Sequence, residues 1–207
     1  MINGHGDDLY RYTTPITSNF SSNVFCGIDH SVLFQRLADA LPRLCSYPEP
    51  EPASLESALA AFFRVPADSV CFTNGATEAI YLIAQAFRGR KSAVWMPTFS
   101  EYADACRLHG HRVSSFYTYE GLPSDADIAW LCNPNNPTGR LIADDLLEEI
   151  LRICREKNIA LFVDECFLSL SDGGVDLTPS LSDFPQLFIL KAFTKSFGMA
   201  GLRLGYG

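Results

Sequence analysis

A lysine and an arginine near the carboxyl end of the sequence could together bind a carbonyl compound that carries a phosphate. Lys195 follows an apolar run, residues 187–190, which predicts a buried strand. A lysine held at a strand end can form an imine with a carbonyl cofactor. Arg203 comes eight residues later within Gly-Leu-Arg-Leu-Gly, where glycines allow close approach and a guanidinium can bind phosphate. Taken alone, this pattern is equally typical of a surface lysine after a strand.

A second candidate phosphate site is the Asn-Gly-Ala-Thr turn of residues 74–77. It follows a short predicted strand, 69–72, and precedes a predicted helix, 78–87. A glycine-bearing turn from strand into helix points free backbone N–H groups at an anion, and the positive end of the helix dipole adds to the attraction. Gly75, Ala76 and Thr77 are therefore candidate phosphate ligands, although such a turn is generic by itself.

Two further motifs place polar side chains directly after apolar strands. The sequence Asn-Pro-Asn-Asn-Pro-Thr-Gly at 133–139 follows a predicted strand, 127–132, and its repeated Asn-Pro predicts an extended, rigid turn. Asp164 follows another predicted strand, 159–163. An aspartate at a buried strand end is costly unless it has a partner, so we expect Asp164 to face one, with a helix-cap or surface position as the alternative.

The elements that must position these residues alternate between strand and helix. Besides those given above, we predict strands at 93–96 and 111–117, and helices at 31–40, 52–63, from about 100 to 109 and at 143–157. This alternation is typical of a parallel α/β sheet. Ligands of such sheets bind beyond the carboxyl ends of the strands, where residues 75–77, 136, 164 and 195 are all expected to lie.

Composition and charge argue against two classes of partner. The net charge of −8 disfavours nucleic acid, whose phosphates require a basic surface. No apolar run approaches the about 20 residues that span a bilayer, so no membrane partner is expected. Seven scattered cysteines without a Cys-x-x-Cys pair predict reduced, buried thiols in a cytoplasmic protein, with neither a disulfide framework nor a metal site. His109 and His111 have no partner nearby in the sequence and are interpreted as surface residues.

The order of the four motifs resembles the large domain of pyridoxal-phosphate (PLP) dependent class I/II aminotransferases, the aspartate aminotransferase superfamily of fold type I. The resemblance covers most of the chain, from about residue 18 onwards. Within the superfamily, the sequence is most similar to the threonine-phosphate decarboxylase and histidinol-phosphate aminotransferase group. The four motifs together make a specific signal, whereas none of them does so alone.

The resemblance implies a three-layer α/β/α large domain with a mostly parallel sheet. Residues 1–50 would form an N-terminal arm, and residues 51–207 the PLP-binding domain. The family's C-terminal small domain has no counterpart here, so we expect the chain to be incomplete at its carboxyl end. The full-length form would be a homodimer in which each site is shared between subunits.

The resemblance also implies roles for individual residues. Lys195 would hold PLP as a Schiff base and later move the Cα proton, while Asp164 would pair with the pyridinium nitrogen. Asn136 would donate to the 3′-oxygen, and the Asn136–Pro137 bond would be cis. Tyr102 would stack on the pyridine ring, with Phe99 as a competing candidate.

Further implied contacts concern the phosphate group of PLP. The 75–77 turn, Arg203 and Thr194 would bind it within one subunit. Tyr47, in a Tyr-Pro pair, would reach the phosphate of the neighbouring subunit; an ordinary turn tyrosine is the alternative. Ala192 replaces a serine or threonine that usually faces the phosphate, and Thr194 or Lys191 could compensate for the missing hydroxyl.

Other departures from the family pattern bear on the reaction. Phe167 stands where aminotransferases usually have a tyrosine whose hydroxyl reaches the 3′-oxygen, and phenylalanine cannot donate. The segment 18–23 resembles a substrate-proximal Asp-Phe-Ser-x-Asn, but Asn19 replaces the aspartate and Phe25-Cys26 replaces a following Asn-Pro. His5-Gly6 resembles an N-terminal pair of threonine-phosphate decarboxylases.

These observations lead to one expected function and two alternatives. The expected function is a PLP-dependent enzyme that acts on an amino acid or an amino-acid phosphate. Phe167 together with the Pro-Thr-Phe-Ser-Glu-Tyr segment of residues 97–102 favours threonine-phosphate decarboxylation. The first alternative is transamination, as with histidinol phosphate. The second is a truncated or non-catalytic PLP-binding domain.

Overall fold

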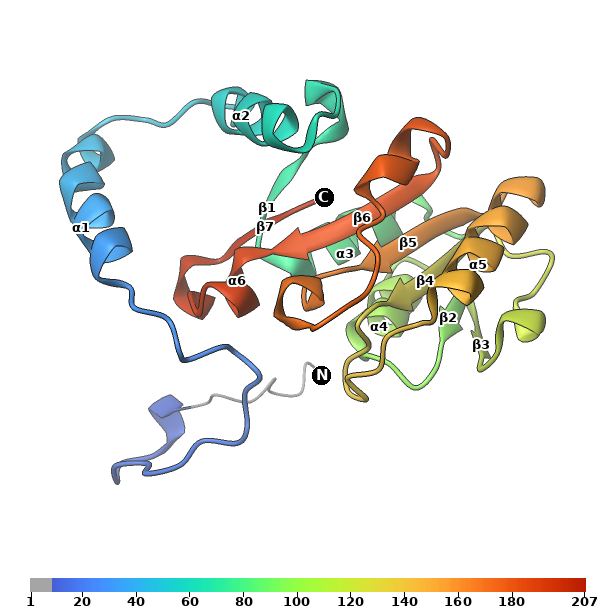
Figure 1. The fold of residues 1–207 in the computed structure, drawn as a ribbon, viewed down its shortest axis with the longest axis horizontal. Helices are drawn as coiled ribbons and strands as arrows, with labels where there is room; N and C mark the ends of the chain where they lie inside the picture. The colour runs from blue at the N-terminus through green and yellow to red at the C-terminus, as the bar shows by residue number, and fades with distance from the viewer. Residues whose placement is uncertain (1–8) are drawn as a thin grey trace.

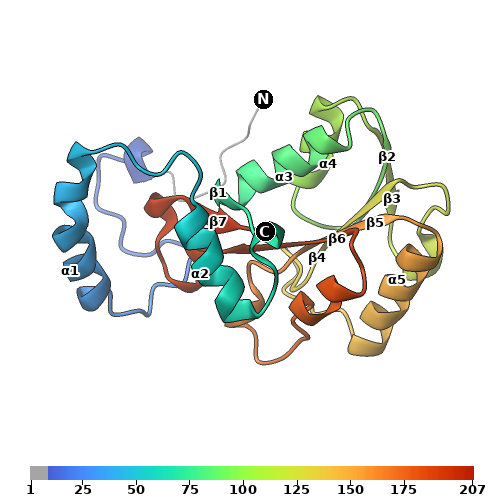
Figure 2. The same ribbon diagram turned by 90° about the horizontal axis from the view of Figure 1, so that it is seen from above.

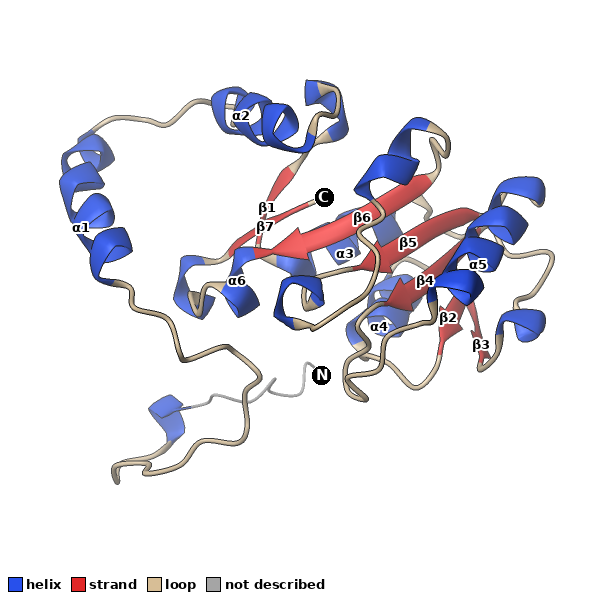
Figure 3. Ribbon diagram, in the orientation of Figure 1, coloured by secondary structure: helices blue, strands red, loops and turns tan. Residues whose placement is uncertain are grey.

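A mixed sheet forms the centre of the molecule, with helices on both of its faces (Figures 1 and 3). The computed structural model describes residues 9–207, so the His5-Gly6 pair lies outside the described residues. Seven strands are arranged in the order β1-β7-β6-β5-β4-β2-β3. Strand β7 pairs antiparallel with both of its neighbours, while β2 to β6 pair in parallel.

The strands are short and the central ones are fully buried. Their bounds are β1 Phe72–Asn74, β2 Lys91–Trp95, β3 Arg112–Phe116, β4 Ile128–Cys132, β5 Ala160–Asp164, β6 Leu187–Ala192 and β7 Leu204–Tyr206. Every residue of β4 and β5 is buried. This explains their near-continuous apolar sequences, since parallel sheets are covered on both faces.

Three helices cover the two faces of the sheet (Figure 2). Helices α3 (Ala76–Ala86) and α4 (Glu101–Leu108) lie on one side and α5 (Asp144–Glu156) on the other. Alternate side chains of β4 contribute to two separate cores: Trp130 packs on the α3 and α4 side, and Leu131 packs beneath α5. The fold is that of the large domain expected from the sequence, with the carboxyl ends of the parallel strands at one edge.

The residues that precede the sheet bury few of their own side chains. Helix α1 (Ser31–Ala40) lies apart from the sheet in Figure 1 and contains no buried residue. Helix α2 (Ala53–Phe63) buries only Ala60. The short helices are η1 Leu9–Arg11, η2 Leu41–Cys45, η3 Ala67–Ser69, η4 Tyr119–Gly121, η5 Leu168–Leu170, η6 Thr178–Ser182, α6 Phe193–Ser196 and η7 Ala200–Leu202. Within the described residues, the helices are too short or too polar to cross a bilayer.

The predicted boundaries of the first strand and its following helix were wrong. A 3-10 turn occupies 67–69, the strand begins at Phe72, and α3 begins at Ala76 rather than at 78. The reason is local: Gly75 has a φ of 77°, which ends the strand. The Glu78 carboxylate then accepts the N–H of Asn74 at 2.6 Å, at the entry to the helix.

Two predictions of burial also need correction. His111 is buried rather than on the surface, with Nδ1 at 2.7 Å from the Ser92 hydroxyl and Nε2 at 2.7 Å from the Ala84 carbonyl oxygen. Cys71 is exposed, as are Cys26 and Cys45, whereas the other four cysteines are buried and all seven are free. Sequence patterns could not reveal these cases, because burial depends on which segments pack over a residue.

Candidate active site

A cavity of about 440 Å³ opens at the carboxyl ends of β4, β5 and β6. Residues from all four sequence motifs line it. The predicted site residues among its lining are Ala76, Thr77, Tyr102, Asn136, Asp164, Thr194, Lys195 and Arg203. The topology therefore brings together segments from across the chain at the edge of the sheet where ligands of parallel α/β folds bind.

Asp164 is the buried carboxyl group at the base of this site. It ends β5 and is 5% exposed. Its Oδ1 accepts the Cys166 N–H at 2.9 Å, and its Oδ2 accepts the Tyr102 hydroxyl at 2.7 Å. Burial raises the pKa of Asp164, while hydrogen bonds from Cys166 and Tyr102 and the charge of Lys195 act in the opposite direction. A carboxylate in such a dry environment is stabilised by a cationic partner.

Lys195 lies in α6, directly after β6, and its amine faces the N-terminal arm. The Nζ atom donates to Asn23 Oδ1 at 2.8 Å and lies 5.6 Å from the centre of the Phe167 ring. The sequence analysis did not include Asn23 among the predicted site residues. Asn23 is the last residue of the 18–23 segment that resembles Asp-Phe-Ser-x-Asn, but the departures at Asn19 and at residues 25–26 made a substrate contact there doubtful. Phe20, Ser21 and Ser22 of the same segment also line the cavity.

The 75–77 turn and Arg203, the predicted phosphate ligands, lie against each other. A Cβ on Gly75 would lie 2.5 Å from Arg203 Nη2 and would displace the guanidinium from the turn, and the φ of 77° at Gly75 also favours glycine. Gly205 lets β7 approach the start of α3, since a Cβ there would lie 2.7 Å from the Ala76 nitrogen. Among residues 9–207, Arg203 forms no ion pair, and its Nη1 makes only a 3.4 Å hydrogen bond to the Ala200 carbonyl. A guanidinium beside a helix N-terminus is suited to phosphate.

The aromatic residues at the cavity differ in their exposure. Tyr102 is fully buried, lies nearly parallel to Trp130 with a ring separation of 6.2 Å, and donates its hydroxyl to Asp164. Phe99 is partly exposed, lines the cavity and meets Tyr102 edge-on. The hydroxyl contact gives Tyr102 a role that the sequence did not reveal. The stacking of Tyr102 or Phe99 on a ligand ring stays a prediction.

The Asn-Pro turn has the backbone that the resemblance implied. The Asn136–Pro137 peptide bond is cis, which confirms the prediction, and Asn133–Pro134 and Met96–Pro97 are cis as well. Asn136 lines the cavity, and its backbone N–H donates to Cys132 Sγ at 3.4 Å. The turn therefore presents Asn136 at the same opening as Lys195.

Tyr47 does not reach the cavity of its own chain. Its side chain is fully exposed in the segment between η2 and α2. The resemblance placed its contact in a neighbouring subunit, and that contact stays a prediction.

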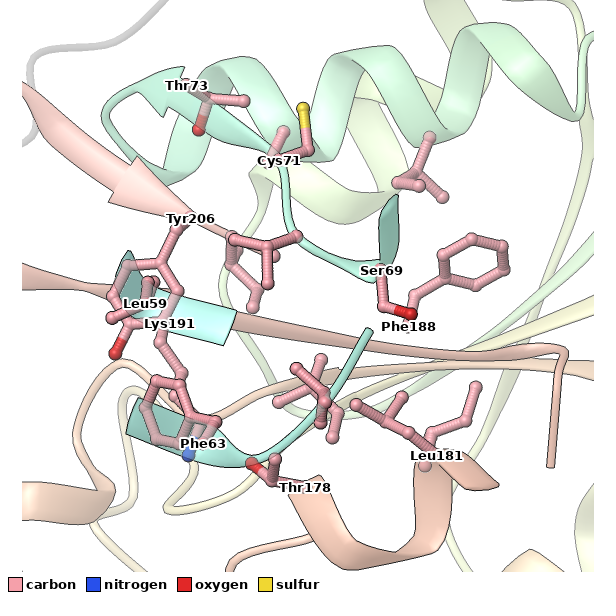
Figure 4. A pocket seen from close by; sticks show the side chains of 18 of the residues that line it. Leu59, Phe63, Ser69, Cys71, Thr73, Thr178, Leu181, Phe188, Lys191 and Tyr206 are labelled. Atoms are coloured by element: carbon pink, nitrogen blue, oxygen red, sulfur yellow. The ribbon is translucent and has the colours of Figure 1, made fainter. Parts of the chain in front are cut away.

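Lys191 does not line the cavity and pairs with two carboxylates instead, which leaves Thr194 as the residue that could compensate for Ala192. Its Nζ lies 3.1 Å from Glu165 Oε2 and 2.9 Å from Asp176 Oδ1, on the far side of β6 from the cavity's Ala192. It also borders a separate, mostly apolar cavity of about 280 Å³ between α2 and the sheet, where it lies beside Phe63 (Figure 4). Neither Lys195 nor Asp164 lines that cavity, so the cavity of about 440 Å³ at the carboxyl ends of the strands is the candidate active site.

The fold matches the large domain of PLP-dependent transferases, and comparison with known proteins identifies the family. The chain belongs to the aminotransferase class I and II family, whose sequence model matches residues 15–207.

Named relatives lie in two groups of this family. Threonine-phosphate decarboxylase of Salmonella typhimurium is 33% identical over 201 residues, which cover 91% of this chain and 55% of the relative. A histidinol-phosphate aminotransferase of Desulfitobacterium hafniense is 36% identical over 179 residues, 77% of this chain and 48% of the relative. The crystal structure of L-threonine-O-3-phosphate decarboxylase from Porphyromonas gingivalis has a TM-score of 0.84 and 33% identity, covering 89% of this chain and 57% of that one. The chain thus spans about half the length of the curated relatives it matches.

Proposed function

We propose that the chain forms the PLP-binding part of an enzyme that acts on an amino acid or an amino-acid phosphate, with Lys195 as the amine that binds the cofactor. One observation carries the proposal: a lysine amine and a dry carboxylate, Asp164, line the same cavity as an anion-binding turn. Lysine suits a carbonyl group, the turn with Arg203 suits a phosphate, and the carboxylate suits a cationic ring nitrogen.

The residues present fit PLP on chemical grounds. Burial raises the pKa of Asp164, and a protonated pyridine nitrogen is a partner that would keep the carboxylate charged. A Cβ on Gly75 would collide with Arg203, so the turn and the guanidinium form a cradle that a larger residue would fill. Thr194 is buried at the cavity wall and offers a hydroxyl in place of the one that Ala192 lacks.

Each residue has a distinct task in this proposal. When bound, PLP supplies an electron sink for the pair released from a broken Cα bond. Asp164 would hold a proton at the ring nitrogen, and the Asn136 amide would donate to the 3′-oxygen. The Lys195 amine, once free, would move a proton at Cα. Phe167 cannot donate, so Asn136 would be the main donor to that oxygen.

For the reaction itself, we propose decarboxylation of an amino-acid phosphate such as threonine phosphate. Phe167 in place of the usual tyrosine and the likeness to two threonine-phosphate decarboxylases support it. Transamination of a substrate such as histidinol phosphate is the second candidate, favoured by the 36% identity to the Desulfitobacterium hafniense protein. The choice depends on which Cα bond the substrate-binding groups hold perpendicular to the ring.

We further propose a homodimer with an N-terminal arm, residues 1–50, against the partner, and a PLP-binding domain from residue 51. Large apolar side chains of the arm are exposed within one chain, among them Tyr10, Phe20, Leu44 and Tyr47. Covering them in a partner interface would remove a sizeable apolar surface from water. The seven free cysteines suit a reducing compartment such as the cytoplasm.

The first test asks whether Lys195 binds the cofactor. PLP is added to the purified chain, borohydride is used to reduce any lysine adduct, and the labelled peptide is identified by mass spectrometry. We expect the label on Lys195 and its loss in Lys195→Ala, while the exposed Lys157→Ala serves as a matched control. Labelling that is unchanged in Lys195→Ala would contradict the proposal.

The second test separates the reactions. Protein loaded with PLP, without borohydride treatment, is incubated with threonine phosphate and, separately, with histidinol phosphate and a 2-oxo acid. Carbon dioxide release and amino transfer are then measured in both mixtures. Carbon dioxide from threonine phosphate is the expected result. Amino transfer without carbon dioxide would favour the second candidate, and PLP binding with neither product would favour a non-catalytic domain.

A further inference from the structure

We propose that residues 23–30, here called the strap, hold the Lys195 helix α6 in position, with Asn23 and His30 as positioning residues. The strap belongs to the N-terminal arm, and α6 lies near the other end of the sequence. The importance of this positioning for catalysis rests on the proposed role of Lys195, but the contacts themselves do not.

Three hydrogen bonds join the strap to the α6 region. Asn23 Oδ1 accepts the Lys195 amine at 2.8 Å. The backbone N–H of Phe25 donates to the Lys195 carbonyl at 3.1 Å. His30 Nε2 lies 2.6 Å from the carbonyl oxygen of Phe197; because a carbonyl can only accept, Nε2 must carry the hydrogen.

Helix α6 needs such partners because it is only four residues long. The last carbonyl groups of a helix have no partner within the helix, and a single turn is not stable by itself. The Gly198 N–H reaches the Lys195 carbonyl only at 3.3 Å. Donors from the strap therefore satisfy carbonyl groups on both sides of the end of α6 and restrain the backbone that carries the lysine.

The two backbones approach so closely that glycine is required at the crossing. A Cβ on Gly198 would lie 2.5 Å from the Phe25 carbonyl oxygen and 3.3 Å from the His30 ring, and Gly198 has a φ of 62°. This is a packed backbone contact, and it places the strap across the end of α6.

The strap is itself held at its far end. The His30 ring stacks on Phe34 of α1 with a centroid distance of 5.3 Å. Asp29 accepts the backbone N–H of Ser31 at 2.9 Å, at the start of that helix. The order and placement of α1, which buries no residue of its own, are thereby coupled to the position of the lysine.

Amide hydrogen exchange of the 207-residue chain tests this inference. In His30→Ala and Asn23→Ala, we expect exchange in a peptide covering 193–200 to rise by about two- to tenfold, the effect of losing one hydrogen bond. A peptide of β5, 160–164, should be unchanged. His30→Gln retains a side-chain N–H donor, so its peptide 193–200 should exchange more slowly than that of His30→Ala. His109 lies beside Tyr81, so His109→Ala is the matched control and should leave exchange at 193–200 unchanged.

A second readout follows the amine directly. Reductive methylation with formaldehyde, analysed by mass spectrometry, should modify Lys195 faster in Asn23→Ala, with Lys157 as the internal reference. Unchanged exchange at 193–200 in both alanine variants would contradict the positioning role of the strap, even if PLP labels Lys195. Equal acceleration at 160–164 would also overturn it, because it would indicate general destabilisation. Faster exchange at 193–200 without PLP labelling of Lys195 would instead reject the proposed function and leave the strap standing.

Discussion

At the scale of single residues, the hydroxyl of Tyr102 is one of the groups that lower the pKa of Asp164 against the effect of burial. Burial raises the pKa of Asp164 and the Tyr102 hydrogen bond lowers it, so Tyr102→Phe should raise the pKa further and leave more of the carboxyl neutral. A neutral carboxyl holds a protonated ring nitrogen less well. We expect PLP affinity, measured by absorbance titration at neutral pH, to fall about tenfold, the size of one hydrogen bond to a charged group.

Tyr81→Phe provides the matched control for this change. Its hydroxyl also donates to a carboxylate, Glu101, at 2.8 Å, but Tyr81 does not line the cavity. This variant should bind PLP as the wild type does. Equal PLP affinity of Tyr102→Phe and the wild type would show that the hydroxyl of Tyr102 does not act on the site.

At the scale of elements, the contact between β7 and the start of α3 positions the 75–77 turn. A Cβ on Gly205 would meet the Ala76 nitrogen and the Gly75 carbonyl carbon at 2.7 Å, both backbone atoms that cannot rotate away. Gly205→Ala should therefore lower the free energy of unfolding by about 1–3 kcal/mol, as overpacking does. Gly201→Ala, where a Cβ meets nothing within 4 Å, should change it little. Urea unfolding measures both, and equal stability of the two variants would contradict the prediction.

At the scale of the whole molecule, buried Glu165 makes stability depend on pH. Burial raises its pKa from 4.5 to about 7, against the opposing charge of Lys191. Between pH 4.5 and about 7, the carboxyl group of Glu165 therefore stays protonated in the folded protein and is deprotonated in the unfolded chain. The contribution of Glu165 is therefore fully present below pH 4.5 and is lost as the pH rises through about 7. This pKa shift corresponds to a contribution of about 3 kcal/mol to the free energy of unfolding.

Unfolding free energies between pH 4.5 and 8 check this sign. Glu165→Gln has no such proton to lose, so the wild type should lose stability relative to it as the pH rises. The exposed Glu148→Gln should follow the wild type. Parallel curves for the wild type and Glu165→Gln would show that Glu165 titrates alike in both states.

Much of the architecture was predictable because it depends on local pattern. Helix α1 was predicted at its observed bounds, α5 and the buried strands β4 and β5 within a residue or two. The apolar positions of α5, such as Leu147, Ile150 and Leu151, recur at helical spacing and are buried. Boundaries failed at β1, where a short strand leads through Gly75 into α3, since three residues carry too little periodicity to fix a limit.

The sequence by itself predicted which chemical groups the candidate site contains, because most of the motifs follow a strand end, and the rule for parallel sheets brings strand ends together. Lys195, Asp164 and Asn136 were found in this way, whereas Arg203 was found from the two glycines that flank it in Gly-Leu-Arg-Leu-Gly. Only the tertiary structure decided where the side chains point. It turned Lys191 toward Glu165, placed the Tyr102 hydroxyl on Asp164 and brought Asn23 to Lys195. These contacts join segments distant in the chain, so no local pattern of residues records them.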